Sequence, residues 1–203
     1  RIGAIIPAMN TYPLEKILKE IDDALKAGAH PIAAFDADGT LWDTDAGDNF
    51  FEYVINNKLV PLPENPLKHY DHLKKGVSYP TGYLWMAQIF DGVEEEQVRK
   101  WSQACLESLG ETPIIKQQQE LIKELHKRNI DVYVVTASMK WAVEPGAKLY
   151  NIPQDKVLGV KTKIIDGKFT TDQDGPITWR EGKATAILEE TGGKNPVFAS
   201  GNT

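Results

Sequence analysis

The chain has 203 residues, of which 41% are hydrophobic and 26% are charged, and its formal net charge at pH 7 is -6. These values are ordinary for a globular protein, and the length suffices for one core or for a core with a small inserted domain. The acidic balance argues against a nucleic-acid partner, no apolar run approaches the roughly 20 residues of a membrane span, and the single cysteine, Cys105, excludes an internal disulfide.

The two ends of the chain leave its location and its full extent open. The sequence begins at Arg1 rather than at methionine, as expected after removal of a signal peptide and equally for a trimmed chain. A cytoplasmic and an exported, periplasmic location therefore both stay open, and nothing in the sequence indicates the oligomeric state. At the other end, Thr203 closely follows an apolar run. Because loops after buried strands carry function, we expect further residues beyond it.

The first predicted element is a helix over Pro13–Ala27, where apolar residues recur at helical spacing and Thr11 is a candidate cap. The run Pro31–Phe35 is then continuously apolar and stops at Asp36. Such a run, bounded by turn-forming residues, is typical of a strand that is buried on both faces. The N-terminal part thus predicts a helix followed by a central strand.

The pattern changes after this strand. Helical spacing occurs at Asp48–Asn57 and at Glu94–Leu109, with Pro- and Gly-containing loops between them and no obvious strand. We interpret the stretch 45–111 as an inserted helical cap domain, entered through the loop that leaves the first strand. The core domain would then comprise residues 1–44 and 112–203.

Beyond the insert, helices and strands alternate. The predicted helices are Ile114–Arg128, Met139–Tyr150 and Glu181–Glu190, and the predicted strands are Ile130–Val135 and Pro196–Ser200. Strands that alternate with helices are typical of βαβ units, so the sequence predicts an α/β fold with a parallel sheet. Lys161–Ile165 and Lys168–Thr171, joined by an Asp-Gly pair, predict a hairpin.

Two carboxylates close the first strand in the motif Asp36-Ala-Asp38-Gly-Thr. Placing two charges at the end of a buried strand is costly unless something uses them. One carboxylate could attack phosphorus while bound to Mg²⁺, and the other could protonate a leaving alcohol and later deprotonate water. The alternative is an Asp-rich turn that caps a helix, since Asp-Gly is a common turn pair.

Three further polar residues are candidates for a phosphate or metal site. Thr136 ends the second predicted strand, and its hydroxyl could donate to a phosphoryl oxygen while Ser138 caps the next helix. Lys183 stands at the start of the last helix and could reach inward to phosphate, with Arg180 as the rival for that role. Asn202 follows the last strand and offers a neutral oxygen ligand for a hard cation. Each has an ordinary alternative as a helix cap, a solvated charge or a turn former.

In this order the motifs resemble those of the haloacid dehalogenase superfamily of aspartate-nucleophile phosphatases, whose helical cap of the first type is inserted at the same place. The resemblance implies a Rossmann-like core, Mg²⁺ as cofactor, a covalent aspartyl-phosphate and a small phosphate ester as substrate. It assigns Asp36 as the nucleophile, Asp38 as the acid–base, and Thr136 and Lys183 as phosphate-binding residues. As metal ligands it implies Asp36, the backbone carbonyl of Asp38, and Asn202, where many members have Asp. A second acidic residue is expected a few places later, where the sequence has already ended.

Three other functions fit parts of this pattern. A haloacid dehalogenase also has a strand-terminal Asp but does not need Asp38, whose proton suits an alkoxide leaving group. A bacterial receiver domain combines Asp, Thr and Lys at strand ends but lacks the insert and the Asp-X-Asp-Gly-Thr motif. A catalytically impaired phosphate-ester-binding protein of the same fold would need neither Asp36 nor Asp38. Phosphate release from a generic ester discriminates among them.

Within the superfamily the sequence is similar to phosphoserine and phosphorylcholine phosphatases. Phosphoserine phosphatases have a Glu nine residues after the nucleophile that binds the substrate amine, and Asp45 stands there. Their cap Arg, which binds the substrate carboxylate, aligns with Leu84. Together with the aromatic side chains of Trp42, Tyr83 and Trp85, Asp45 could bind an alkylammonium group, so we expect a substrate with a cationic, carboxylate-free head group. The alternative is that these aromatic residues form the cap's own core.

Overall fold

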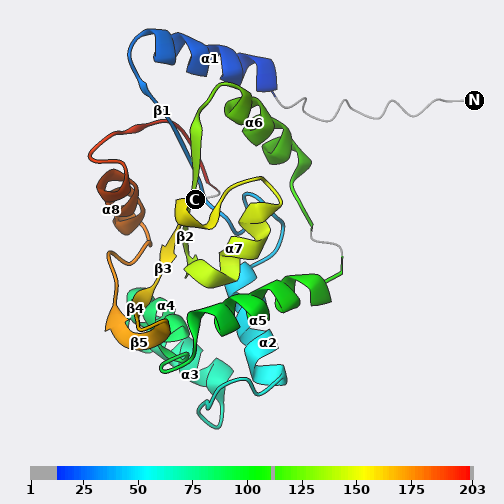
Figure 1. Ribbon diagram of the computed structural model, residues 1–203, viewed down its shortest axis with the longest axis vertical. Helices are drawn as coiled ribbons and strands as arrows, with labels where there is room; N and C mark the ends of the chain where they lie inside the picture. The colour runs from blue at the N-terminus through cyan, green and yellow to red at the C-terminus, as the bar shows by residue number, and fades with distance from the viewer. Residues whose placement is uncertain (1–12, 111–112, 202–203) are drawn as a thin grey trace, which may run out of the picture.

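The computed structural model describes residues 13–110 and 113–201, and it has an α/β architecture with a helical insert (Figure 1). The central sheet has four parallel strands in the order β3-β2-β1-β6. The predicted strands are confirmed, with the first between the other two. The sequence did not indicate β3, because a four-residue run that contains a glycine is too short to show a period. The strands are β1 (His30–Phe35), β2 (Asp131–Met139), β3 (Val157–Val160) and β6 (Pro196–Ser200).

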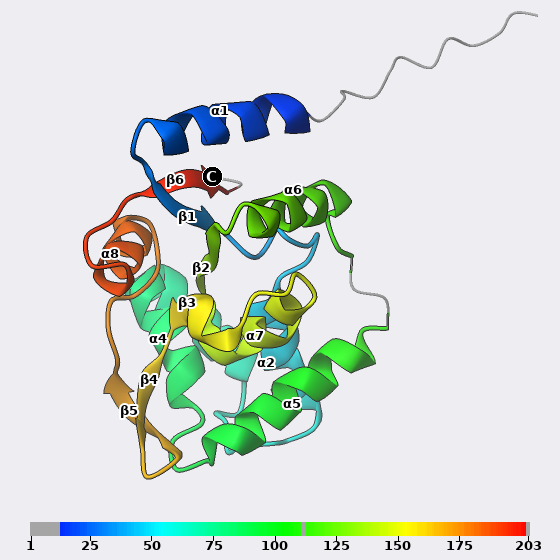
Figure 2. The same cartoon turned by 45° about the horizontal axis from the view of Figure 1, so that its top comes forward.

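Helices cover both faces of the sheet (Figure 2). Successive side chains of a strand point to opposite faces. Ala33, Phe35 and Val134 therefore share a core with α1, α6 and α7, whereas Ile32 and Val135 pack with α8. The four helices are α1 (Leu14–Lys26), α6 (Lys116–Lys127), α7 (Lys140–Lys148) and α8 (Glu181–Glu190), all close to their predicted ranges. The candidate cap Thr11 lies outside the described residues. None of the helices that the structure describes is both long and apolar enough to span a membrane.

The carboxyl ends of β1, β2 and β6 meet at one edge of the sheet. Phe35 is in register with Val134 of β2 and with Ser200 of β6. The backbone N–H of Asp36 then donates to the Ser200 carbonyl at 2.9 Å. The residues that follow these strands are therefore neighbours, as the alternating pattern predicts.

The second strand is longer than predicted. It was expected to end at Thr136, but β2 continues to Met139, which pairs with Val160 after a register shift. The physical reason is β3, which supplies a hydrogen-bonding partner that the sequence did not reveal. The additional residues of β2, up to Met139, line the cavity that is described below.

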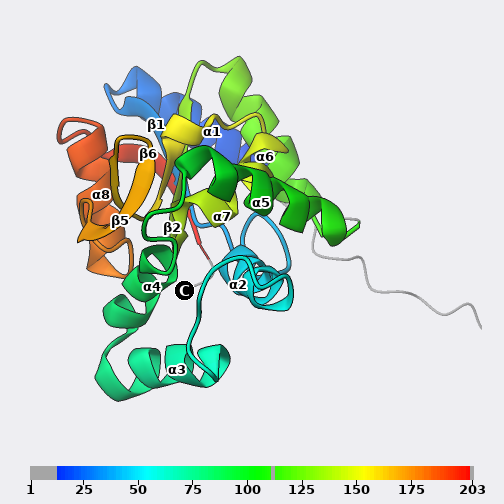
Figure 3. The same cartoon turned by 60° about the horizontal axis from the view of Figure 1, so that its bottom comes forward.

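The insert between β1 and β2 is mainly helical. The prediction of loops between its first and last helices was wrong, because three helical segments lie there. Pro66 and Pro80 occupy the first turns of α3 and α4, where the missing N–H of proline breaks no helical hydrogen bond. Figure 3 shows α3 and α4 at one end of the insert and α5 at the other. The boundary expected at Glu111 lies outside the described residues. The segments are α2 (Ala46–Asn56), α3 (Pro66–His72), the π-helical turn η1 (Leu73–Val77), α4 (Tyr79–Gln88) and α5 (Glu95–Ser108).

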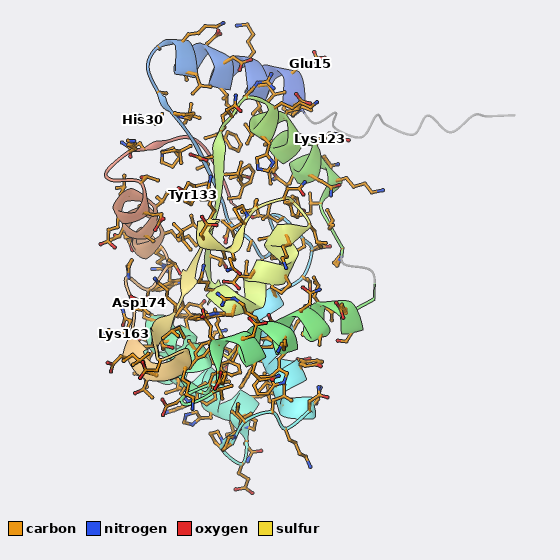
Figure 4. All side chains as sticks on the ribbon, viewed as in Figure 1. Glu15, His30, Lys123, Tyr133, Lys163 and Asp174 are labelled. Atoms are coloured by element: carbon orange, nitrogen blue, oxygen red, sulfur yellow. The ribbon has the colours of Figure 1, made fainter. Side chains whose placement is uncertain are left out.

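The predicted hairpin is confirmed as β4 (Thr162–Ile165) and β5 (Lys168–Gln173), but it packs against the insert. The backbone N–H of Gly92 donates to the Phe169 carbonyl at 2.9 Å. The Phe169 ring lies 5.6 Å from the ring of Phe90 in the insert. Lys163 and Asp174 lie on the outer side of the hairpin (Figure 4). A segment that the sequence assigned to the core therefore packs with the insert.

An ion-pair network also joins the insert to the core. Arg99 of α5 contacts Glu144 of α7 through Nε at 3.0 Å and Nη2 at 3.4 Å. Arg99 also pairs with Glu95 at 2.9 Å, and Lys140 pairs with Glu144 at 3.4 Å. The Glu144 side chain is only 7% exposed. These contacts hold α5 against α7.

Candidate active site

The first motif forms a tight turn at the carboxyl end of β1. The Ala37 carbonyl accepts from the N–H groups of Thr40 at 3.0 Å and Leu41 at 2.8 Å. Gly39 has a φ of 69°, which glycine adopts without strain. The turn places the side chains of Asp36 and Asp38 in the wall of one cavity.

Lys183 forms an ion pair with the first of these carboxylates. Its Nζ lies 2.6 Å from Oδ2 of Asp36. Lys183 stands in the first turn of α8, which starts so close to the preceding loop that a Cβ at Gly182 would lie 1.9 Å from a backbone oxygen. Arg180 instead places its guanidinium 4.4 Å from the Trp179 ring and does not line the cavity. Of the two rivals, Lys183 is thus the cation that faces Asp36.

Three donors hold the carboxylate of Asp38. Oδ1 accepts from the indole Nε1 of Trp42 at 2.8 Å and from the backbone N–H of Ala46 at 2.7 Å, and Oδ2 accepts from the Ser138 hydroxyl at 2.6 Å. Burial, and second the charge of Asp45, raise the pKa of Asp38 to about 6 although the three donors lower it. A carboxyl with this pKa can take up or release a proton near neutral pH, as a general acid–base must.

Ser138 does not cap α7, contrary to the prediction. The N-cap of α7 is Met139, which makes no side-chain cap bond, and the Ser138 hydroxyl binds Asp38 instead. A Cβ at Gly47 would lie 2.8 Å from the Ser138 hydroxyl oxygen. The glycine therefore lets the first turn of α2 approach closely enough for the Ala46 N–H to reach Asp38. Neither Ser138 nor Gly47 carries a sequence signal for this role.

Thr136 lines the same cavity and is 1% exposed. Its hydroxyl oxygen accepts from the backbone N–H of Ser138 at 3.1 Å, and its carbonyl accepts from the Thr178 hydroxyl at 2.5 Å. Because the Thr136 hydroxyl accepts in this contact, its own proton stays available for a ligand oxygen. The position suits the phosphate-binding role that the sequence predicts.

The cavity has a volume of about 140 Å³. This is well below the roughly 300–1,000 Å³ of pockets for drug-sized ligands, so it suits a small ester. The core contributes Asp36, Asp38, Thr136 and Lys183 to its wall. The insert contributes mainly polar and aromatic side chains, namely Asp45, Asp48, Tyr70, Lys74 and Tyr83, together with the apolar Met86.

Two of the predicted substrate-binding residues do not line the cavity. Trp42 is 1% exposed, and its indole is engaged with Asp38 rather than with the cavity. Trp85 packs inside the insert, where its ring lies 5.6 Å from that of Phe51. Trp42 is therefore buried and Trp85 half-buried against other side chains, which agrees with the alternative that these indoles do not form a cation site.

The other two, Asp45 and Tyr83, do line the cavity. Asp45 is the N-cap of α2, and its Oδ1 accepts from the backbone N–H of Asp48 at 2.8 Å. The ring of Tyr83 already faces a cation of the chain, the ammonium of Lys74, at 5.6 Å. The sequence did not single out Lys74, because one of two adjacent lysines is typical of a solvated surface. Leu84, which was aligned with the family's cap Arg, does not line the cavity.

The oxygen atoms at the turn fit a hard divalent cation such as Mg²⁺. The Asp36 carboxylate and the Asp38 backbone carbonyl are oxygen donors, and Mg²⁺ is commonly held by one or two carboxylates together with water and phosphate oxygens. Asn202, the third predicted ligand, lies outside the described residues. Residues 13–110 and 113–201 contain no cluster of three or more His, Cys, Asp or Glu side chains that could hold a metal. A site built from one carboxylate and one carbonyl does not require such a cluster.

Comparison with known proteins gives a family and a fold. A family model described as haloacid dehalogenase-like hydrolase matches residues 33–202. A search of curated proteins gave no match. A solved protein of unknown function from Bordetella pertussis Tohama I is 16% identical, with a TM-score of 0.69 over 81% of this chain and 75% of its own. A substrate-bound phosphoserine phosphatase is 20% identical, with a TM-score of 0.50 over 82% of this chain and 73% of its own. At these identities the structural likeness concerns the fold and not the substrate.

Proposed function

The chain belongs to the haloacid dehalogenase-like hydrolase family, and we propose that it is a Mg²⁺-dependent phosphatase that hydrolyses a small phosphate monoester through an aspartyl-phosphate. One observation carries the proposal: the carboxylate of Asp36, which is paired with the ammonium of Lys183, shares one cavity with the carboxyl group of Asp38. The first is the nucleophile and the second is the acid–base. We also propose that residues 45–111 act as the cap domain, and that 1–44 and 112–203 form the core domain.

In the first step, an oxygen of Asp36 forms a bond to phosphorus while the bond from phosphorus to the ester oxygen breaks. Asp38 transfers its proton to the leaving oxygen, so that an alcohol departs. The raised pKa of Asp38 supports this role, because a proton must be bound near neutral pH before it can be given up. Thr136 and Lys183 donate hydrogen bonds to the phosphoryl oxygens.

In the second step, water attacks phosphorus, and the Asp38 carboxylate accepts the proton of the water. The bond between phosphorus and Asp36 breaks, and inorganic phosphate leaves with both carboxyl groups restored. The N–H and O–H donors of Trp42, Ala46 and Ser138 support this step because they stabilise and orient Asp38 in its charged form.

The charges of the site also support a phosphate substrate. Asp36 and a phosphate monoester are both anions, so their approach is unfavourable unless cations lie nearby. Lys183 provides one positive charge at 2.6 Å from Asp36. Mg²⁺ held by the Asp36 carboxylate and the Asp38 carbonyl would supply further charge neutralisation at the phosphoryl group.

The proposal is tested by measuring phosphate release from p-nitrophenyl phosphate in the presence of Mg²⁺, with a panel of small phosphate esters beside it. Release that depends on Asp36 supports the phosphatase. Halide release from a 2-haloacid without phosphate release from any ester would instead indicate a dehalogenase and contradict the proposal.

A further inference from the structure

Lys74 is a charged group in the cavity wall that the proposed mechanism does not use. Among the described residues that line the cavity, the Lys and Arg side chains are Lys74 and Lys183, and Lys183 is paired with Asp36. No ion pair between described residues involves Lys74, whereas its neighbour Lys75 pairs with Asp71 at 2.6 Å. The fold thus places an ammonium in the cavity wall without a carboxylate of residues 13–110 or 113–201 in direct contact with it.

Three tyrosine rings hold this ammonium in place. The Nζ of Lys74 lies 4.6 Å from the ring centre of Tyr70, 5.6 Å from that of Tyr83 and 6.0 Å from that of Tyr79. A ring face attracts a cation through its quadrupole but carries no net charge. The ammonium is therefore oriented by the rings, and its positive charge remains available to an anion.

The backbone around Lys74 accommodates this placement. Leu73–Val77 is π-helical, and the N–H of Ser78 donates to the Leu73 carbonyl at 2.9 Å. Such turns are rare and occur frequently at functional sites. On α4, a Cβ at Gly82 would lie 2.4 Å from Cγ of Lys74, so the glycine leaves room for the lysine stem. Figure 3 shows α3 and α4, the two helices that flank η1.

Asp45 is the competing partner for Lys74 within the protein. Desolvation raises the pKa of Asp45, whereas the charge of Lys74 lowers it, so the two groups interact through the cavity. However, Oδ1 of Asp45 is engaged by the backbone N–H of Asp48 as a helix cap. A ligand anion can therefore reach Lys74 without first breaking an ion pair with Asp45.

We propose that Lys74 binds a carboxylate of the substrate, so that the preferred phosphate esters carry one carboxylate in addition to the reacting phosphate. One ammonium matches one negative charge, and a cavity of about 140 Å³ leaves room for only a short spacer between the two groups. The inference rests on the proposed phosphatase function. It replaces the expectation of a cationic, carboxylate-free head group, because the Tyr83 ring already faces a cation of the chain.

The test compares two esters that differ only at one end: phosphoglycolate, which ends in a carboxylate, and ethyl phosphate, which ends in a methyl group. The ratio of their kcat/KM values is measured for the full chain and for Lys74→Met, Lys74→Arg and Lys75→Met. We expect the unchanged protein to favour phosphoglycolate at least tenfold, which corresponds to about 1.4 kcal/mol. Lys74→Met should lose this preference, Lys74→Arg should retain most of it, and Lys75→Met should match the unchanged protein.

Because both esters are measured on the same preparation, a partly unfolded variant lowers both values and leaves the ratio unaffected. Equal kcat/KM values in the unchanged protein, or a preference that survives Lys74→Met, would overturn the inference. In that case hydrolysis of p-nitrophenyl phosphate would leave the proposed function intact. Absence of phosphate release from all three esters would overturn the proposed function and this inference with it.

Discussion

The hydroxyl of Ser138 donates to Oδ2 of Asp38 at 2.6 Å, although the two residues lie 100 positions apart in the chain. The contact links the end of β2 to the turn that follows β1. It exists because β2 continues past Thr136 to Met139 and because Gly47 leaves room beside the hydroxyl. The orientation of the proposed acid–base thus depends on the core and the insert together.

We expect Ser138→Ala to lower kcat for p-nitrophenyl phosphate by roughly 10- to 100-fold, because a hydrogen bond to a charged group contributes about 1.5–3 kcal/mol. The measurement is steady-state hydrolysis with Mg²⁺. Ser108→Ala is the matched control, since its hydroxyl donates to the Cys105 carbonyl of its own helix, at 2.7 Å, away from the cavity. Equal losses of kcat in the two variants would show that Ser138 has no special role.

Replacing Lys183 should have a much larger effect than replacing Arg180. Lys183→Ala removes the cation 2.6 Å from Asp36, so we expect kcat/KM to fall by a factor on the order of 10². Arg180→Ala removes a guanidinium that lies over Trp179 and should change kcat/KM less than about threefold. Steady-state hydrolysis of p-nitrophenyl phosphate by the two variants shows whether Lys183 or Arg180 matters for activity. The assignment of Lys183 is wrong if the Arg180 variant is the more impaired.

Removal of divalent cations should abolish phosphate release, because the Asp36 carboxylate and the Asp38 carbonyl fit Mg²⁺ and the reaction brings two anions together. Activity is measured after treatment with a chelator and again after addition of MgCl₂. Restoration by MgCl₂ but not by an equal ionic strength of NaCl is the expected result. Full activity in excess chelator would contradict the metal role.

The network around Glu144 should matter for stability rather than for chemistry. Glu144→Ala leaves Arg99 and Lys140 without their shared, nearly buried partner, so we expect the free energy of unfolding to fall by about 2–4 kcal/mol. Urea denaturation measures this change. Glu107→Ala, an exposed change on the same face of the insert, should stay within about 0.5 kcal/mol. A similar small value for Glu144→Ala would show that the network does not stabilise the contact between α5 and α7.

Much of the fold could be predicted because β1, β2 and β6 contain continuous apolar runs and the core helices show clear periodicity. What the sequence missed has both local and long-range causes. β3 is too short to show a period, and α3 and α4 begin with prolines that suggested loops. The packing of the hairpin against the insert depends on contacts between residues far apart in the chain, such as Phe90 and Phe169.

Some residues of the candidate site could likewise be predicted from the sequence, and others could not. Asp36, Asp38, Thr136 and Lys183 follow from motifs at strand and helix ends, and the structure brings all four to one cavity. Lys74 was not found from sequence, because the sequence predicted loops where α3, η1 and α4 lie, and the packing of these segments surrounds the lysine. The rings of three tyrosines face its ammonium, and Gly82 of α4 leaves room for its aliphatic carbons. Trp42 and Trp85 were assigned to the substrate because aromatic residues beside the first motif and beside Leu84 could bind an alkylammonium group. In the structure Trp42 is buried and bonded to Asp38, and Trp85 is half-buried against Phe51.

The most direct test of the account is to locate the phosphoryl group during turnover. The protein is mixed with p-nitrophenyl phosphate and Mg²⁺, quenched in acid and digested, and the phosphorylated peptide is identified by mass spectrometry. We predict a phosphoryl group on Asp36, no measurable turnover in Asp36→Asn, and turnover slower by roughly 10² to 10⁴ in Asp38→Asn. Phosphate release by Asp36→Asn at a rate near that of the unchanged protein, or a phosphoryl group on any other residue, would contradict the account.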